Sequence, residues 1–421
     1  MKLYARSTVV ACLILYLSAG DIEAQVFASI EQLEVPGSGM AEEPSLVGLP
    51  DGRVLLSWTE LSGPTYAEVR MSLFDGNVWT DPMTVAFGDD LFVNYADFPS
   101  AVGLEDGSIA IQWLQMNGAS SYGYDIKIAT SADDGATWGQ AVIPHRDGSP
   151  LQHGFVSLLP DGPNGLLAMW LDGRNYDTAR PILDGNIDLN TMQLRATSYS
   201  TEAGLGEDLV LDTQTCTCCQ TSATIAAEGT VILAYRDRTV EEIRDISVIR
   251  RVGGQWEQPT LVSGDGWEIA GCPVNGPAVD AHGDSVALVW FTAADDVPAV
   301  KIAFSGDRGA SFGTARRIDL GDPLGRVDVL QLSDGSALFS WVEMVGSDEV
   351  YMVCRASEIE GCGEPERLAI STSGRIIGFP RIETVRGYVY LAWTELPRDA
   401  TGNPEGGTVI RVARATLELF P

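Results

Sequence analysis

The sequence is short of basic residues. Only 27 of its 421 residues are Lys or Arg, whereas 58 are Asp or Glu, which gives a formal net charge of −31 at pH 7. A chain this acidic repels the phosphates of nucleic acid, so we expect no nucleic-acid partner, and an anionic membrane surface is disfavoured for the same reason. The charge is explained either by solubility in a salty or extracellular setting or by cation binding through clustered carboxylates, which are hard oxygen ligands.

Long apolar runs are also scarce. The one marked run, 8–17 (TVVACLILYL), follows Lys2 and Arg6 and is followed by small residues up to Ala24. This is the pattern of a secretory signal peptide, and the run is too short to span a bilayer. We therefore predict a signal peptide over 1–24.

This leader predicts export to the periplasm or the extracellular space. We expect the remainder, 25–421, to form a single domain. Cys12 lies in a loose lipoprotein-type box, but the apolar run continues past it, so we do not expect a lipid anchor. No later segment is long and apolar enough to form a transmembrane helix, and we expect the mature protein to be soluble.

The strongest positive signal is an internal repeat. Short apolar runs end in an aromatic residue, at successive spacings of 55, 57, 65, 55, 51 and 52 residues. A turn signal and a further short strand precede several of these aromatics, and a third and a fourth strand follow. Four short strands in about 50 residues, without convincing helices, indicate an all-β propeller whose aromatics pack between neighbouring blades. The aromatics are Trp58, Trp113, Trp170, Tyr235, Trp290, Trp341 and Trp393.

The two ends of the chain indicate how the ring closes. The last repeat unit ends after its third strand, whereas 29–35 (SIEQLEV) resembles a fourth strand without partners. This N-terminal strand could complete the last blade and remove a free sheet edge. We predict seven four-stranded blades; six with one irregular unit is the alternative.

Two segments carry a turn motif of the form S-x-D-x-G. SADDGATW and SGDRGASF each place Ser and Asp where they cap backbone amides, Gly where φ is positive, and an aromatic that packs inward. We interpret both as structural locks on a hairpin. Their residues are Ser131, Asp133, Gly135 and Trp138 in the first copy and Ser305, Asp307, Gly309 and Phe312 in the second.

With these two copies in place, the whole mature chain resembles the sialidase-like (BNR/Asp-box) propeller superfamily. The resemblance implies glycan binding or, if the protein is an enzyme, glycoside hydrolysis of the sialidase type, with no cofactor required. Sialidases grip the substrate carboxylate with arginines and usually have six blades and an F-R-I-P motif near the N-terminus. The chain lacks that motif, and Phe379-Pro380-Arg381-Ile382 has a different order at the other end.

Charged residues gather where a propeller forms the top of its central channel. Five of the seven positions two residues after the repeat aromatics are carboxylates, and arginines fall in the same upper loops. We predict a charged funnel for an acidic glycan or another anionic ligand, with Asp172 and Asp237 as the catalytic carboxylates. The alternative is that the acids and arginines pair to tie blades together. The predicted substrate contacts are Arg174, Arg238, Arg326, Arg381 and His153.

Six cysteines follow the leader. Cys354 and Cys362 flank a short hairpin, and we expect them to form a disulfide. The other four allow two interpretations: one disulfide to Cys272 with the remaining two cysteines paired locally, or thiolates that hold copper or zinc, with His153 as a further ligand. These four are Cys216, Cys218, Cys219 and Cys272.

Three functions therefore stay open from the sequence. The first is a glycan-binding or glycan-hydrolysing propeller, the second a soft-metal or redox propeller, and the third a non-catalytic scaffold whose rim meets a protein partner.

Overall fold

The computed structural model describes residues 30–37, 39–118, 120–177, 183–184, 187–188, 190–371, 377–399 and 403–420. The predicted signal peptide lies outside these ranges. Within them, no helix is long and apolar enough to cross a membrane.

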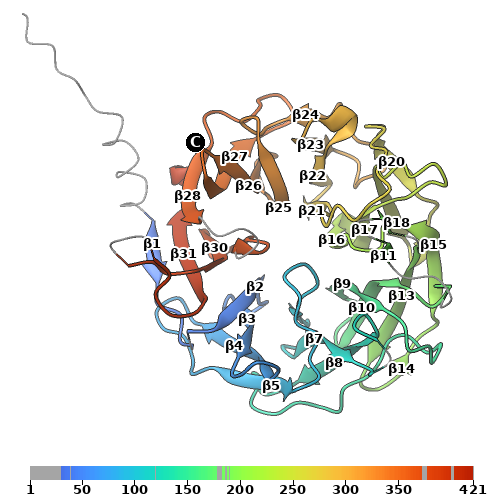
Figure 1. The fold of residues 1–421 in the computed structure, drawn as a ribbon, viewed down its shortest axis with the longest axis vertical. Coiled ribbons are helices and arrows are strands. Elements are labelled where there is room, and N and C mark those ends of the chain that lie inside the picture. Colours follow the sequence, from blue (N-terminus) through green and yellow to red (C-terminus); the bar gives the residue numbers. More distant parts are fainter. Residues whose placement is uncertain are drawn as a thin grey trace, which may run out of the picture.

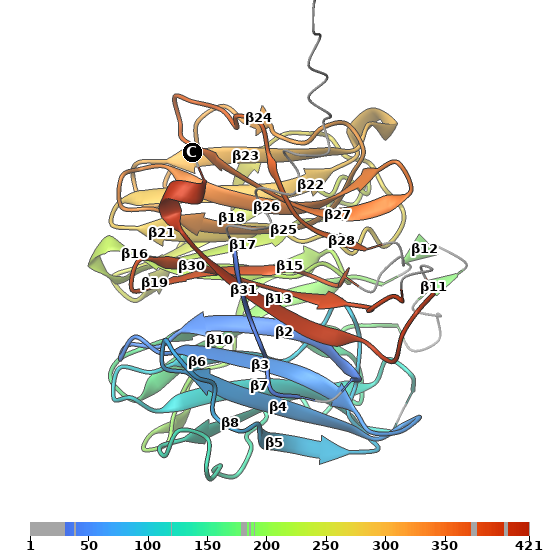
Figure 2. The same cartoon turned by 90° about the vertical axis from the view of Figure 1, so that its left-hand side faces the viewer.

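The chain forms a seven-bladed β-propeller, as the repeat predicted (Figure 1). Each blade is an antiparallel sheet whose strands follow one another outward from the channel. Figure 2 shows the blades edge-on as successive layers. The first blade consists of β2 (Ala41–Gly48), β3 (Val54–Leu61), β4 (Ala67–Phe74) and β5 (Met83–Gly88).

The second and third blades depart most from the ideal unit. The second contains β6 (Ser100–Gly103), β7 (Ile109–Met116) and β8 (Tyr124–Ser131), and its outer position holds one isolated bridge between Ile128 and Val142. The third contains β9 (His153–Pro160), β10 (Gly165–Asp172), β13 (Met192–Ser200), β14 (Gly204–Leu205) and β15 (Leu209–Thr215). Its extra hairpin, β11 (Leu183–Asp184) and β12 (Ile187–Asp188), accounts for the longest spacing in the repeat.

Blades five and six follow the regular four-stranded pattern, and the fourth has one additional short strand. The fourth contains β16 (Ser222–Ala226), β17 (Thr230–Arg236), β18 (Ile246–Val252), β19 (Gln255–Trp256) and β20 (Thr260–Ser263). The fifth contains β21 (Ala278–His282), β22 (Ser285–Thr292), β23 (Ala299–Ser305) and β24 (Arg316–Arg317). The sixth contains β25 (Pro323–Gln331), β26 (Ala337–Val345), β27 (Asp348–Ala356) and β28 (Glu366–Ser371). Short 3₁₀ turns are η1 (Ala227–Gly229), η2 (Ala294–Asp296) and η4 (Leu417–Leu419).

The seventh blade joins the two ends of the chain. Its strands are β29 (Arg381–Val385), β30 (Tyr388–Glu395), β31 (Val409–Thr416) and, from the N-terminus, β1 (Glu31–Leu33). Because β1 pairs antiparallel with β31, with Glu31 opposite Arg414, the predicted closing strand is confirmed. In Figure 2 the last blade lies between the first blade and the sixth.

Apolar side chains from neighbouring blades form the core. Trp58, Trp170, Trp290 and Trp341 are fully buried. Trp58, for example, lies in one cluster with Val385 and other residues of the seventh blade. Each sheet covers the face of the next. Burial of these indole groups therefore stabilises the propeller as a whole and not any single blade.

Both turns with the S-x-D-x-G motif have the same hydrogen bonds. The Ser131 hydroxyl accepts the Gly135 amide (2.9 Å) and donates to Asp133 (2.8 Å). In the second copy Ser305 does the same with Gly309 (2.9 Å) and Asp307 (2.7 Å). Gly135 and Gly309 have φ values of 86° and 74°, a region that favours glycine, and Trp138 and Phe312 pack on the neighbouring apolar clusters.

Candidate functional site

The loop between β5 and β6 crosses to the centre of the ring, where it is drawn in light blue in Figure 1. Tyr95 and Phe98 contact Phe379 before β29, with ring centroids 6.4 and 5.9 Å apart. The Gln220 side chain, just before β16, donates to the backbone oxygen of Ala96 (2.6 Å). One loop of the second blade is therefore anchored on the fourth and seventh blades.

A cavity of about 600 Å³ lies beside this loop, and we call it the mouth pocket. Three of its lining residues, Ala96, Asp97 and Phe155, also line the narrower hollow between the innermost strands. The mouth pocket and the central channel therefore adjoin and share part of their walls. Its other lining residues are Phe92, Asn94, Tyr95, Tyr122, Tyr124, Gln152, Thr217, Cys218, Ile269, Ala270, Gly271, Cys272 and Val274.

Aromatic rings dominate one side of the mouth pocket. Phe92 and Tyr124 are stacked at 3.9 Å between ring centroids, with 16° between their planes. Tyr122 is 39% exposed, so part of its ring faces solvent. Flat apolar rings beside polar groups are the usual composition of a ligand pocket.

Asp97 is the one charged residue among those that line the mouth pocket. It is buried, and its two carboxyl oxygens accept the Phe155 amide (2.7 Å) and the Tyr124 hydroxyl (2.9 Å). Gln152 in turn donates to the Tyr124 oxygen (2.8 Å). Burial raises the pKa of Asp97 to about 7 against the opposing effect of these hydrogen bonds. Near neutral pH this group therefore both holds and releases a proton.

A second buried carboxyl group lies nearby at the start of β2. Glu43 accepts the Thr59 hydroxyl (2.9 Å). Burial raises the pKa of Glu43 well above its usual range, the Thr59 hydrogen bond opposes this, and the charges of Glu42 and Asp97 add to the rise. Two interacting carboxyl groups with raised pKa values thus lie close together at the top of the channel.

The backbone at the top of the innermost strands is strained. Glu43, Phe155, Val274 and Arg326 have φ values of 60°, 55°, 51° and 54°. Non-glycine residues in this region cost about 1–3 kcal/mol each, and such strain gathers at functional sites. At Glu43, Phe155 and Arg326 the strand register shifts by a bulge, which redirects the side chains around the channel.

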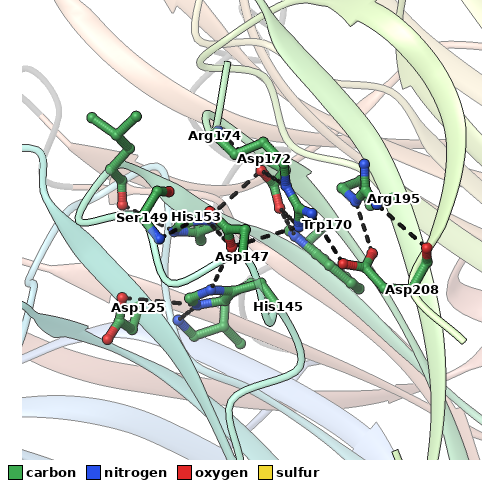
Figure 3. A network of polar contacts seen from close by, with 12 residues as sticks. Asp125, His145, Asp147, Ser149, His153, Trp170, Asp172, Arg174, Arg195 and Asp208 are labelled. Atoms are coloured by element: carbon green, nitrogen blue, oxygen red, sulfur yellow. Dashed lines mark hydrogen bonds and ion pairs between the residues drawn. The ribbon is translucent and has the colours of Figure 1, made fainter. Parts of the chain in front are cut away.

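The predicted residues Asp172, Arg174 and His153 do meet, but outside the mouth pocket (Figure 3). The Asp172 carboxylate is fully buried and accepts the Trp170 indole N–H (2.8 Å) and two guanidinium N–H groups of Arg174 (2.8 and 2.7 Å). Arg174 also pairs with Asp208 (3.1 Å). With the Arg174 backbone amide (3.0 Å), four donors occupy the carboxylate.

Figure 3 also shows His145 and Asp147, which were not predicted from the sequence, beside the predicted His153. The His145 and His153 rings are stacked at 3.6 Å, and Asp147 lies 3.5 Å from His145 Nδ1 and 3.3 Å from His153 Nε2. Burial, and then the charge of His153, lowers the pKa of His145 to about 4. The network joins the segment after β8 to the start of β9, next to Gln152 at the mouth pocket. Its signal in the sequence was two of only three histidines within nine residues.

Of the other predicted site residues, Asp237 and Arg238 are neighbours just after β17, whereas Arg326 and Arg381 belong to the sixth and seventh blades. Asp237 accepts the Arg238 amide (2.7 Å) and the Ser247 hydroxyl (3.2 Å), and burial, followed by the charge of Asp212, raises its pKa. Each predicted arginine has an acidic partner: the remaining pairs are Arg238 with Glu242, Arg326 with Glu349 and Arg381 with Asp328. Of the four arginines, Arg381 lines the channel.

The carboxylates that follow the repeat tryptophans have a role that the sequence analysis missed. Three of these four carboxylates accept the indole N–H of the tryptophan two residues earlier, because alternate side chains of a strand share one face, whereas the fourth, Glu395, pairs with Arg411 (2.9 Å). The pairs are Trp58 with Glu60 (3.4 Å), Trp170 with Asp172 (2.8 Å) and Trp341 with Glu343 (2.7 Å).

The six described cysteines form three disulfides. Cys354 pairs with Cys362, as expected from the hairpin that they flank. Cys218 pairs with Cys272, and Cys216 with Cys219, with Cα atoms 6.0 and 5.9 Å apart. This is the arrangement with one disulfide to Cys272 and one local pair, and Cys218–Cys272 forms part of the mouth-pocket wall.

No protein-family model matches the sequence, and no curated protein matches it. Among solved structures, a protein of unknown function from Dyadobacter fermentans DSM 18053 is 14% identical, with 92% of this chain and 98% of that chain covered and a TM-score of 0.50. Polysaccharide lyase Uly1 is 8% identical over 92% of each chain, with a TM-score of 0.51. The NanB sialidase from Streptococcus pneumoniae is 12% identical over 96% of this chain and 73% of that one, with a TM-score of 0.48. The first two likenesses span nearly the whole ring, and the chain shares their propeller fold.

Proposed function

We propose that this protein binds a glycan in the mouth pocket. The observation that carries the proposal is the meeting of aromatic rings with the hydrogen-bonded set Asp97, Tyr124 and Gln152 in one cavity. Sugar rings present an apolar face to aromatic side chains and hydroxyls to polar ones. The cavity volume of about 600 Å³ falls within the range of ligand pockets, about 300–1,000 Å³.

The charges around the cavity favour a neutral sugar at the aromatic side. No Lys or Arg lines the mouth pocket among the residues that the structure describes, so nothing there pairs with an acidic group. Arg381 lies in the channel below and is 3.3 Å from Asp328. An acidic sugar, as predicted from the sequence, would have to displace that pair to reach a cation.

Two further proposals concern family and location. The two turns with the S-x-D-x-G motif have equivalent hydrogen bonds, which supports membership of the BNR/Asp-box propellers. Three disulfides support export, because such bonds persist in oxidising compartments. N-terminal sequencing of protein recovered from the periplasm or medium tests the export and the leader.

Binding is tested with a panel of neutral and acidic oligosaccharides by calorimetry, and cleavage by assay of new chain ends. Tyr122→Ala should weaken binding by roughly two- to twelvefold, since loss of one stacked ring costs about 0.5–1.5 kcal/mol. Tyr388→Ala is the matched control, because Tyr388 has the same exposure, 39%, and lies at the start of β30 beside Arg414, outside the set that lines the mouth pocket. Equal losses in both variants, or no binding of any sugar, would contradict the proposal.

A second candidate function has one specific observation in its favour. The sulfur atoms of Cys216, Cys218 and Cys219 all lie within 4.8 Å of one another, close enough to share a soft metal once they are thiolates. In the disulfide form they offer no thiolate. Titration of the reduced protein with zinc and with copper(I), followed by metal analysis, tests this function; a metal content independent of these cysteines would exclude it.

A further inference from the structure

Two disulfides are in contact at the wall of the mouth pocket. Cys218–Cys272 joins the segment before β16 to the segment before β21, whereas Cys216–Cys219 closes a turn four residues long. The Cys216 and Cys218 sulfurs belong to different disulfides and lie 3.9 Å apart.

The two disulfides differ in accessibility. Cys218 and Cys272 are half-buried and line the mouth pocket. Cys216 and Cys219 are 0% and 1% exposed. A soluble reductant therefore reaches the outer disulfide, Cys218–Cys272, before the inner one.

A buried cation lies beside the inner disulfide. Arg244 Nη1 is 3.6 Å from the Cys216 sulfur, and the guanidinium also pairs with Glu242 (3.0 Å). A positive charge stabilises a nearby thiolate, and the thiolate is the nucleophile in thiol–disulfide exchange. It also favours the approach of an anionic sulfur to Cys216.

We propose that these four cysteines form a thiol–disulfide exchange site that takes a dithiol as its reductant. The dithiol reduces Cys218–Cys272 to two thiols and is itself oxidised to a disulfide, a transfer of two electrons and two protons. The Cys218 thiolate then attacks the Cys216 sulfur. The Cys216–Cys218 bond forms, the Cys216–Cys219 bond breaks, and Cys219 leaves as a thiolate that takes up the proton lost by Cys218.

The exchange changes the wall of the pocket. Before it, a covalent bond links two segments that are 54 residues apart; afterwards the remaining disulfide is local, and Cys272 is a free thiol. The segment 269–274 then loses its covalent tie to Cys218. The redox state of the surroundings would thereby alter the shape of the mouth pocket, whatever ligand it takes.

Disulfide mapping tests the proposal on the full chain. A Cys354→Ala/Cys362→Ala background removes the distant disulfide, and one equivalent of dithiothreitol is followed by acid quenching, denaturation and labelling with N-ethylmaleimide. We expect label on Cys219 and Cys272 and a Cys216–Cys218 disulfide. Label on Cys218 and Cys272 with Cys216–Cys219 intact, or equal label on all four, would overturn the proposal.

A second variant removes the need for a reductant. In Cys219→Ala, one thiol is left over in the folded protein, and it starts on Cys216. The Cys216 thiolate then attacks the Cys218 sulfur, the Cys218–Cys272 bond breaks, and Cys272 leaves as a thiolate that takes up the proton lost by Cys216. We therefore expect the label on Cys272 and a Cys216–Cys218 disulfide. Label on Cys216 would overturn the proposal. A Cys216→Ala/Cys219→Ala variant, reduced and labelled in the same way, confirms that Cys218 accepts the label when no exchange partner is present.

Discussion

Replacing Asp97 by Asn should change how the stability of the protein depends on pH. Asn keeps the shape of the side chain and an oxygen that accepts the Phe155 amide, but it cannot ionise. The wild-type carboxyl group is 3% exposed, and burial raises its pKa from 3.8 to about 7. The folded protein therefore favours the protonated form, whereas the unfolded chain ionises at the ordinary pKa.

The direction and the size of the effect of pH on the unfolding free energy follow from this difference in pKa between the folded and unfolded states. Because the pKa is higher in the folded state, the contribution of Asp97 to stability is complete below about pH 3.8 and is lost as the pH rises through 7. The difference corresponds to about 4 kcal/mol in total, of which about 2–3 kcal/mol falls between pH 5 and pH 8. The unfolding free energy of the wild type should fall by about this amount relative to Asp97→Asn over that interval.

Urea unfolding at pH 5, 6, 7 and 8, followed by tryptophan fluorescence, measures the effect. Glu105→Gln is the control, because Glu105 is an exposed carboxylate on the turn between β6 and β7 of the same blade. Its pH dependence should match that of the wild type. If wild type and Asp97→Asn lose the same free energy between pH 5 and pH 8, the carboxyl group is not buried as described, and its assignment as the proton-holding group of the mouth pocket fails.

Three further predictions concern single side chains and are also measured by urea unfolding. His145→Gln should remove up to about 3 kcal/mol of acid destabilisation between pH 6.5 and pH 4, because burial and His153 lower the pKa of His145 to about 4 and protonation then favours unfolding; an unchanged acid limb would contradict this. Asp172→Ala should cost about 3–5 kcal/mol by leaving the Arg174 guanidinium without its main partner, and a loss below about 1 kcal/mol would show that the pair is not buried. Asp307→Ala should cost about 1–3 kcal/mol through lost hydrogen bonds within its hairpin, without affecting sugar binding, and reduced binding would show that the turn is not purely structural.

The fold could be predicted from the sequence because each blade repeats the same local pattern. An aromatic such as Trp58 recurs at the same place in every unit, and the neighbouring sheet is the one partner that can bury it. The closing strand was likewise recognisable, because the last unit lacked a strand and 31–33 had no partners of its own. Because the units repeat, the strand pattern recognised in one unit predicts the arrangement of all the blades.

The candidate site was harder to predict because it depends on one irregular loop. Asp97 was not among the predicted site residues, because its burial depends on the path of 89–99 across the ring, which no periodic pattern records. Asp172 was predicted to be catalytic because carboxylates recur two residues after the aromatics. That recurrence also follows from the need of a buried indole N–H, as at Trp170, for an acceptor.

The way in which β1 closes the ring determines how the molecule responds to tension between its ends. Glu31, the first residue of β1, pairs with Arg414, near the end of β31, while Leu33 pairs with Val412. A force applied to the two termini therefore acts on the same end of this antiparallel pair. It breaks the hydrogen bonds between the two strands one after another, whereas a shearing force would load all of them together. Tethered by its termini, the propeller should open first at this seam, with the other six blades still stacked.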